Sequence, residues 1–247
     1  MPGTAIVFLP GFMCDYRLFS AQTRALMADG FDCRYGDITN GLSLKSIAKS
    51  ILRKAPKRFA CVGLSMGGLI ALELYKQAPE RISHLALLNT TARADAAGEA
   101  RKNQLKRVAS GNLDLVLREE LKPQYLHPEN HTAERLRLLE TMGRDLGAHV
   151  FCSQTMALST RESYLDDLPS IACPTLVVGG AEDTVCPPDR HIEISSCIDN
   201  ADLRILEKCG HLSVLEQPER VTEALINLLD KPGARLTRTG NVALKIV

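Results

Sequence analysis

The fold is decided by the stretch RFACVGLSMGG, which occupies residues 58–68. Its first five residues are typical of a buried strand, and the residues after Ser65 have helical spacing. Between them lies Gly-x-Ser-x-Gly, followed by a further glycine. This pattern turns the chain sharply from strand to helix and exposes the serine hydroxyl at the carboxyl edge of a sheet. Ser65 is therefore the candidate nucleophile, and the alternative is a serine that only caps the helix.

Further apolar runs predict the rest of a sheet, and segments with helical spacing separate them. The predicted strands are residues 5–9, 33–35, 58–62, 84–88, 175–178 and 203–206. Continuous apolar strands are typical of a parallel sheet that is covered on both faces. The alternation of strands and helices predicts an α/β protein with a doubly wound, mostly parallel sheet.

One segment, residues 94–167, interrupts this alternation. It contains no convincing strand and several helical patterns, including residues 136–142 and 150–158. We expect a helical lid there, inserted between two strands and lying over one end of the sheet. The predicted core then comprises the two segments 1–93 and 168–230.

The last segment, residues 231–247, is a basic tail with four Lys or Arg residues and no acidic residue. Such a tail is usually a solvated chain end. Its last six residues, VALKIV, would also suit an edge strand, either within the chain or on a partner. The sequence is compatible with a homodimer.

A serine hydroxyl is a weak nucleophile and needs a general base. Among six histidines, we favour His211, because it follows the last predicted strand on a loop. That loop lies at the same edge of the predicted sheet as Ser65. The role of base for His211 depends on the serine motif, since the alternative is an ordinary loop histidine.

The base needs an acid that orients it. Asp183 follows the strand at residues 175–178 and reaches the same sheet edge, with Glu182 as its immediate competitor. Asn89, after the fourth predicted strand, carries an amide where a rival acid could have stood, and this favours Asp183. The chain order Ser, Asp, His also agrees with a serine motif of this kind.

An oxyanion hole needs two hydrogen-bond donors aimed at the developing charge. We expect one from the backbone N–H of Met66, directly after the serine, and one from the N–H of Phe12, in the loop after the first strand. The side chains of Phe12 and Met13 are candidates for the pocket wall, the alternative being that both are core. Arg93 is a candidate clamp for a substrate carboxylate, the alternative being a structural salt bridge.

Composition excludes several other classes of function. The net charge of +1 gives no electrostatic reason to expect a nucleic-acid or membrane partner. No spacing typical of metal ligands, phosphate loops or dinucleotide sites occurs, so neither a metal nor a cofactor is expected. Eight scattered cysteines and a start without a signal-peptide pattern are typical of a reduced, cytoplasmic protein.

These motifs resemble the α/β-hydrolase superfamily, and most of all its small bacterial carboxylesterases, lactonases and carbon–carbon bond hydrolases. The resemblance spans about residues 4–230 and rests on LPGF at 9–12, the serine motif, QAPER at 77–81, GGAED at 179–183 and Gly210-His211. It implies a helical lid between the fourth and fifth predicted strands. The chain departs from many relatives at Pro10, where they have histidine.

The resulting hypothesis is a serine hydrolase that cleaves a small ester, thioester or lactone through an acyl-enzyme. Its partner would be a small acyl substrate. One alternative is the cleavage of a carbon–carbon bond by the same three residues. The other is a ligand receptor that retains these residues but has negligible turnover.

Overall fold

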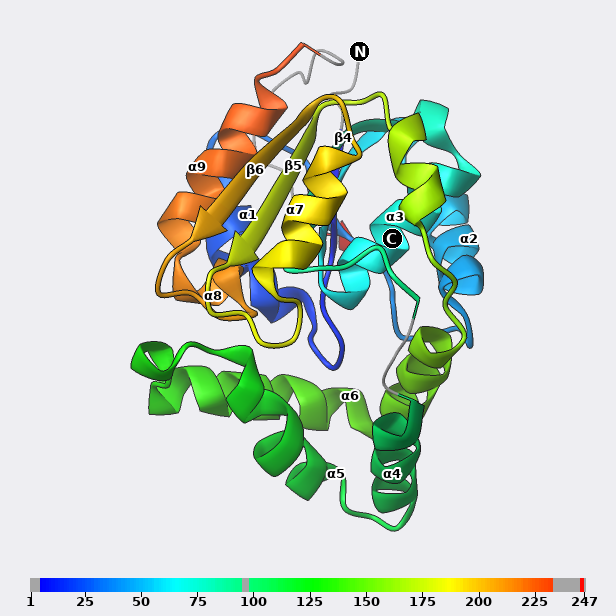
Figure 1. Ribbon diagram of the computed structural model, residues 1–247, viewed down its shortest axis with the longest axis vertical. Helices are drawn as coiled ribbons and strands as arrows, with labels where there is room; N and C mark the ends of the chain where they lie inside the picture. The colour runs from blue at the N-terminus through cyan, green and yellow to red at the C-terminus, as the bar shows by residue number, and fades with distance from the viewer. Residues whose placement is uncertain (1–4, 95–97, 233–244, 247) are drawn as a thin grey trace.

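The computed structural model describes residues 5–94, 98–232 and 245–246 (Figure 1). Its strands form one sheet of order β6-β5-β4-β3-β1-β2-β7, and every paired neighbour is parallel. The strands are β1 (Ala5–Leu9), β2 (Cys33–Tyr35), β3 (Phe59–Leu64), β4 (Ile82–Leu88), β5 (Thr175–Gly180), β6 (Ala201–Leu206) and β7 (Lys245–Ile246). The predicted α/β class with a doubly wound parallel sheet is confirmed.

Helices cover both faces of this sheet, and each face has its own apolar core (Figure 1). Alternate residues of β1 show the division, because Ile6 and Phe8 join one core while Val7 and Leu9 join the other. The helices of the first face are α1 (Ser20–Ala28), α8 (Ser213–Glu216) and α9 (Pro218–Leu229); those of the second are α2 (Leu44–Lys54), α3 (Met66–Gln77) and α7 (Pro188–Ser196). Burial on both faces explains the continuous apolar strands.

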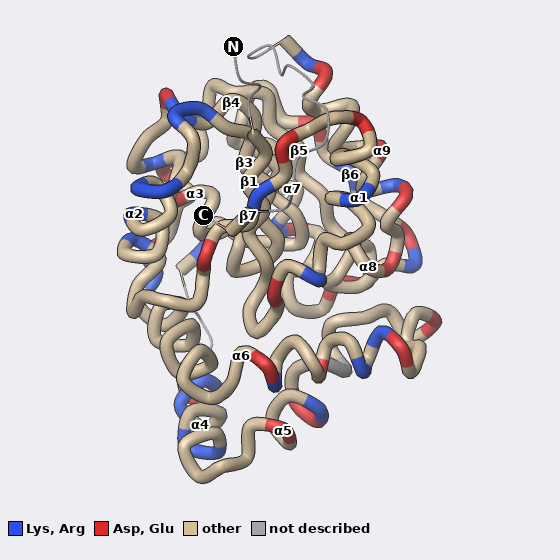
Figure 2. The backbone as a smooth tube through the Cα atoms, turned by 180° about the vertical axis from the view of Figure 1, so that it is seen from behind, with Lys and Arg blue, Asp and Glu red and all other residues tan. Residues whose placement is uncertain are grey.

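A helical layer lies across the end of the sheet toward which the strand arrows point, and it occupies the same place in the view from behind (Figures 1 and 2). Its main elements, inserted between β4 and β5, are α4 (Gly98–Ala109), α5 (Leu113–Leu115), η3 (Val116–Leu121), η4 (Lys122–Tyr125), η5 (Pro128–Asn130) and α6 (Ala133–Ser159). The predicted helices at residues 136–142 and 150–158 both lie in α6. Gly147, with a φ of 78°, separates them.

The chain's last described residues form β7, which pairs with β2 so that Ile246 lies opposite Tyr35. The suggested edge strand is therefore present within the chain at these two residues, while residues 233–244 and 247 lie outside the described part. Among the described helices, none is both long and apolar enough to cross a membrane.

Candidate active site

Ser65 stands between β3 and α3 with a φ of 55°, a conformation that L-residues rarely adopt. The flanking glycines make this turn sterically feasible. A Cβ on Gly63 would lie 2.2 Å from the Gly67 carbonyl oxygen, and a Cβ on Gly67 would lie 1.9 Å from the Leu9 carbonyl oxygen. No side chain fits at either position, so the turn requires glycine at both.

The backbone of Ser65 is anchored on both sides. Its N–H donates to the Leu88 carbonyl at 2.9 Å, and its carbonyl accepts from the Thr90 hydroxyl at 2.8 Å. The Ser65 side chain makes no hydrogen bond that caps α3. Its Oγ lies instead 2.9 Å from Nε2 of His211. The geometry therefore disfavours the reading of Ser65 as a helix cap.

His211 lies between Ser65 and Asp183. Its Nδ1 is 3.0 Å from Oδ1 and 2.9 Å from Oδ2 of Asp183. Both residues are buried, each with 2% of its surface exposed. Because Nδ1 carries the ring proton and donates a hydrogen bond to the carboxylate, Nε2 is left as an acceptor that faces the serine hydroxyl. Three predicted residues far apart in the sequence thus converge.

Asp183 is held as an acceptor by several donors. Burial raises the pKa of this carboxyl, but the attraction of His211 and hydrogen bonds from His211, the Cys186 N–H and the Asn89 amide lower it below its ordinary value. The Val185 N–H, at 2.9 Å from Oδ1, donates as well. Asp183 is therefore ionised at neutral pH, as an orienting acid must be.

Glu182, the competing acid, does not reach the histidine ring. Its carboxylate accepts the Cys209 N–H at 2.9 Å and so holds the loop that leads to His211. Asn89, the amide where a rival acid could have stood, also has a structural role. Its amide donates to Asp183 and to the Gly210 carbonyl, each at 3.1 Å. Both side chains position the residues that we assign to catalysis.

Two residues that hold the His211 loop by hydrogen bonds were not predicted from the sequence. Glu216 is buried, and its carboxylate accepts the N–H groups of Gly210 and Leu212 at 3.0 and 3.1 Å. Tyr125, from the inserted helical layer, offers its carbonyl to the N–H of His211 at 2.9 Å. The only sequence signal was the position of Glu216 five residues after the candidate base.

Ser65 lines a pocket of about 210 Å³ between the sheet edge and the helical layer. Phe12 and Met66, the predicted oxyanion donors, both line it. Its apolar wall also includes Leu69 and Leu158. Its polar wall includes the charged side chains of Arg101 and Arg161, together with neutral side chains that carry hydroxyl or amide groups. This volume lies below the range that is usual for sites of drug-sized ligands.

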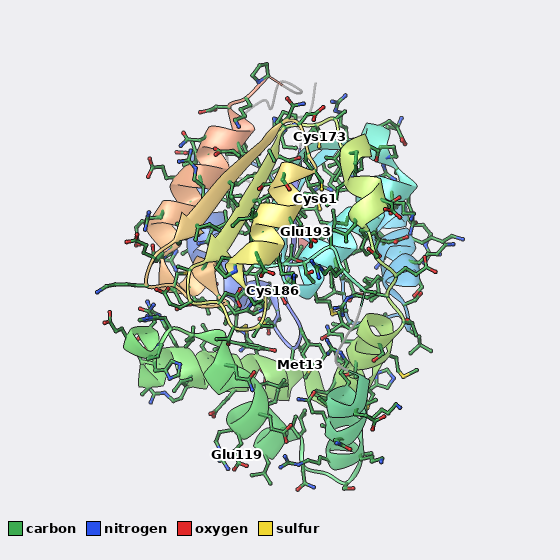
Figure 3. The ribbon with its side chains drawn as sticks, in the orientation of Figure 1. Met13, Cys61, Glu119, Cys173, Cys186 and Glu193 are labelled. Carbon is green, nitrogen blue, oxygen red and sulfur yellow. The ribbon has the colours of Figure 1, made fainter. Side chains whose placement is uncertain are left out.

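Two weaker predictions receive no support from this pocket. Met13 is fully buried in an apolar core and is not among the residues that line the pocket, although it lies between the sheet and the helical layer (Figure 3). Arg93 forms an ion pair with Glu193 at 2.7 Å and is likewise absent from the lining. The geometry favours a core role for Met13 and a structural salt bridge for Arg93.

Among the described residues, no cluster of three or more His, Cys, Asp or Glu could hold a metal ion. Eight free cysteines are scattered through the fold. Figure 3 shows Cys173 toward the end of the sheet that is remote from the helical layer and Cys61 farther along the sheet, whereas Cys186 lies toward that layer and lines the pocket. Burial raises the pKa of the Cys186 thiol above its ordinary value, so this thiol is a poor nucleophile.

His191 of α7 makes the fold sensitive to acid. It is fully buried against Gly179, and burial lowers its pKa from 6.5 to about 4. The neutral ring therefore contributes stability that is complete above pH 6.5 and lost as the pH falls toward 4, a loss of about 3 kcal/mol. We expect H191Q to lose correspondingly less stability than the wild type over this range. Urea unfolding at pH 7.5 and pH 4 measures the loss of stability in each protein. Equal losses in H191Q and the wild type would contradict the assignment of this acid sensitivity to His191.

Comparisons with known proteins identify the family of this fold. Residues 6–224 match a family described as the alpha/beta hydrolase family. A provisionally named carbamate hydrolase of Rhizobium rhizogenes, RutD, is 24% identical over 87% of this chain and 83% of its own. A 2-hydroxy-6-oxononadienedioate/2-hydroxy-6-oxononatrienedioate hydrolase of Pseudomonas is 26% identical over 85% of this chain and 78% of its own. The structure of a thermophilic esterase from Thermogutta terrifontis superposes with a TM-score of 0.84 and 26% identity, over 94% and 92% of the two chains.

Proposed function

Because this chain belongs to the α/β-hydrolase family, we propose that it is a serine hydrolase that cleaves small esters, thioesters or lactones through an acyl-enzyme. The single observation that carries the proposal is the hydrogen-bonded series from Ser65 Oγ through His211 to Asp183, with each step between 2.9 and 3.0 Å. This arrangement activates a hydroxyl that would otherwise be a weak nucleophile.

In the first half-reaction, Ser65 Oγ attacks the substrate carbonyl carbon while His211 Nε2 takes the hydroxyl proton. The negative charge moves to the carbonyl oxygen, where the N–H groups of Met66 and Phe12 would donate to it. The carbonyl then re-forms, the bond to the alkoxide or thiolate breaks, and His211 returns its proton to that leaving group. Asp183 stabilises the imidazolium that exists between the two transfers.

In the second half-reaction, water takes the place of the leaving group. His211 removes a proton from this water, and the resulting hydroxide attacks the acyl carbon of the Ser65 ester. The second tetrahedral intermediate then collapses: the bond between the acyl carbon and Ser65 Oγ breaks, and His211 returns the proton to Oγ. The products are a carboxylic acid and the free enzyme, so protons and electrons balance over the cycle.

The size of the pocket predicts a preference for short acyl chains. At about 210 Å³, the space beside Ser65 suits a small acyl group and excludes a long one. We expect kcat/KM for nitrophenyl acetate and butyrate to exceed that for nitrophenyl dodecanoate by about tenfold or more. A nitrophenyl ester series from two to twelve carbons measures this, and a rise toward long chains would contradict it.

The same assay separates the alternatives. Replacing the esters by a phenyl carbamate or a vinylogous diketone tests the reactions named for the two curated relatives. Turnover of the diketone with no turnover of any ester would favour carbon–carbon bond cleavage. Binding without turnover across all three substrate classes would favour a receptor, and it would overturn the proposed hydrolase.

A further inference from the structure

The loop that carries the predicted second oxyanion donor is a tight turn. The Cys14 N–H donates to the Gly11 carbonyl at 3.1 Å, so Phe12 and Met13 occupy the two central positions. Met13 has a φ of 51°, in the left-handed region that glycine or asparagine usually takes in turns. A methionine there is strained, and it persists only where neighbouring groups hold it.

One of the groups that hold this turn comes from the inserted helical layer. The Met13 N–H donates to the side-chain oxygen of Gln154, in α6, at 2.9 Å. The Gln154 amide nitrogen donates in turn to the Ile38 carbonyl, in the loop after β2, at 3.3 Å. Gln154 is fully buried. Its side chain therefore spans the gap between two loops of the core and uses both of its polar atoms.

A second contact attaches the same helix face to the same turn. The ring of Phe151, three residues before Gln154, packs edge-on against the ring of Phe12 at 5.2 Å between centroids. Four residues after Gln154, Leu158 lines the pocket beside Ser65. Residues three and four apart share one face of a helix. This face of α6 thus contacts the Phe12 side chain, the Met13 N–H and the pocket.

We propose that Gln154 is a positioning residue of the oxyanion hole: by accepting the Met13 N–H it anchors the turn, and it thereby sets the position of the Phe12 N–H, on the neighbouring peptide, relative to the reacting carbonyl. The inference rests on the proposed hydrolase function. The Phe12 N–H belongs to the peptide between Gly11 and Phe12. Because peptides are planar, only the two backbone torsion angles of Phe12 separate it from the peptide that carries the Met13 N–H. The bond from Met13 to Gln154 holds the second peptide, and the contact between the Phe12 and Phe151 rings holds the residue between the two.

The consequence is that the helical layer is part of the catalytic apparatus rather than only a cover. Its α6 holds the loop of the candidate oxyanion donor, and its Tyr125 carbonyl holds the N–H of His211. Movement of this layer relative to the sheet would disturb both. Figure 3 shows Met13 between the core and this layer, where such a connection has to lie.

The test is Q154L, which keeps the bulk of the side chain and removes the amide. We expect kcat for a short nitrophenyl ester to fall by about tenfold to a hundredfold, somewhat less than the loss of a whole donor, with KM within about threefold. A second readout is the kcat/KM ratio between an ester and its thionoester, whose sulfur accepts hydrogen bonds poorly. This ratio should fall in parallel with kcat.

Two further variants distinguish positioning from general destabilisation. Q154E retains an oxygen acceptor for the Met13 N–H, although its second oxygen faces the Ile38 carbonyl and should lower stability. Relative to Q154L, it should therefore recover part of kcat and of the ester-to-thionoester ratio. T155V is the matched control: Thr155 is buried at the next position of α6, and its hydroxyl donates to the Phe151 carbonyl of its own helix rather than to the turn. We expect T155V to keep both kinetic values.

Q154L must first be shown to be folded, by a cooperative thermal transition. If the folded variant keeps the wild-type kcat and the wild-type ester-to-thionoester ratio, the inference is overturned. Equal losses in Q154L and T155V would overturn it too, because they indicate a general effect of the helix. Failure of the proposed function is a different result, since wild-type protein would then show no ester turnover that depends on Ser65.

Discussion

Replacement of Ser65 by alanine is expected to lower kcat for a short ester by about a million-fold. The small activity that remains would come from the oxyanion donors and from substrate binding. The substitution removes only Oγ, the atom 2.9 Å from His211 Nε2. Without it, no acyl-enzyme can form, and water would have to attack the substrate directly. Initial rates with nitrophenyl acetate, at enzyme concentrations high enough to detect slow turnover, give the measurement.

The stability of S65A provides the complementary test. A serine that caps a helix contributes about 0.5–2 kcal/mol, which alanine would lose. The Ser65 side chain makes no capping bond, and alanine has the same Cβ in the same backbone conformation. We therefore expect the free energy of unfolding to stay within about 0.5 kcal/mol of the wild type. A clear loss of stability with activity retained would restore the reading of Ser65 as a helix cap.

The second large effect is expected from D183N, which should lower kcat by about ten-thousand-fold. Asp183 Oδ1 accepts the N–H groups of Val185 and Cys186, each at 2.9 Å, so an asparagine would keep its oxygen there. Its NH₂ group would then occupy the place of Oδ2 and donate to His211 Nδ1. The proton of the neutral ring would move to Nε2, which could no longer accept a proton from Ser65.

The same place is also within 3.1 Å of the Asn89 amide nitrogen, so D183N sets two donors against each other and should lose stability as well. E182Q is the matched control, because Glu182 is the adjacent acid and its carboxylate accepts the Cys209 N–H. A glutamine oxygen can accept that bond, and we expect E182Q to retain kcat within about threefold. A loss in E182Q as large as that in D183N would contradict the assignment of the acid.

The core of the fold could be predicted because its physical cause is local. A strand buried on both faces must be continuously apolar, and β1 and β2 have the bounds that their apolar runs predicted. Strands β3, β4, β5 and β6 each extend beyond one predicted end. β5, for example, continues through Gly180, where close packing against the Cys209 and Gly210 backbone leaves room only for glycine. Apolar patterns alone do not detect such residues.

The three candidate catalytic residues could be predicted for a related reason. In a parallel sheet the carboxyl ends of all strands lie at one edge, so polar residues just after β3, β5 and β6 had to approach one another. The turn geometry of Ser65 followed from its glycines alone. Sequence spacing could not establish the hydrogen-bond distances, which depend on how Glu216 and Asn89 hold the loops.

The pocket wall was much harder to predict. Met13 and Arg93 were plausible pocket residues because they follow strands at the edge where Ser65 lies. The position of a residue in a loop does not reveal which way its side chain points, and the structure places Met13 in an apolar core and Arg93 beside Glu193. Gln154 left one faint signal: it is a polar residue between Phe151 and Leu158, on an otherwise apolar face of α6. Its role depends on a contact with a residue 141 positions away, which no local pattern encodes.

The central claim is that Ser65 is the one hydroxyl made nucleophilic by its neighbours. Treatment with a fluorophosphonate, followed by peptide mass spectrometry, tests it most directly. We predict a single adduct on Ser65, formed in step with the loss of ester hydrolysis and greatly slowed in D183N. Ester turnover that continues while Ser65 is fully labelled, or an inactivating adduct on another residue, would contradict the account.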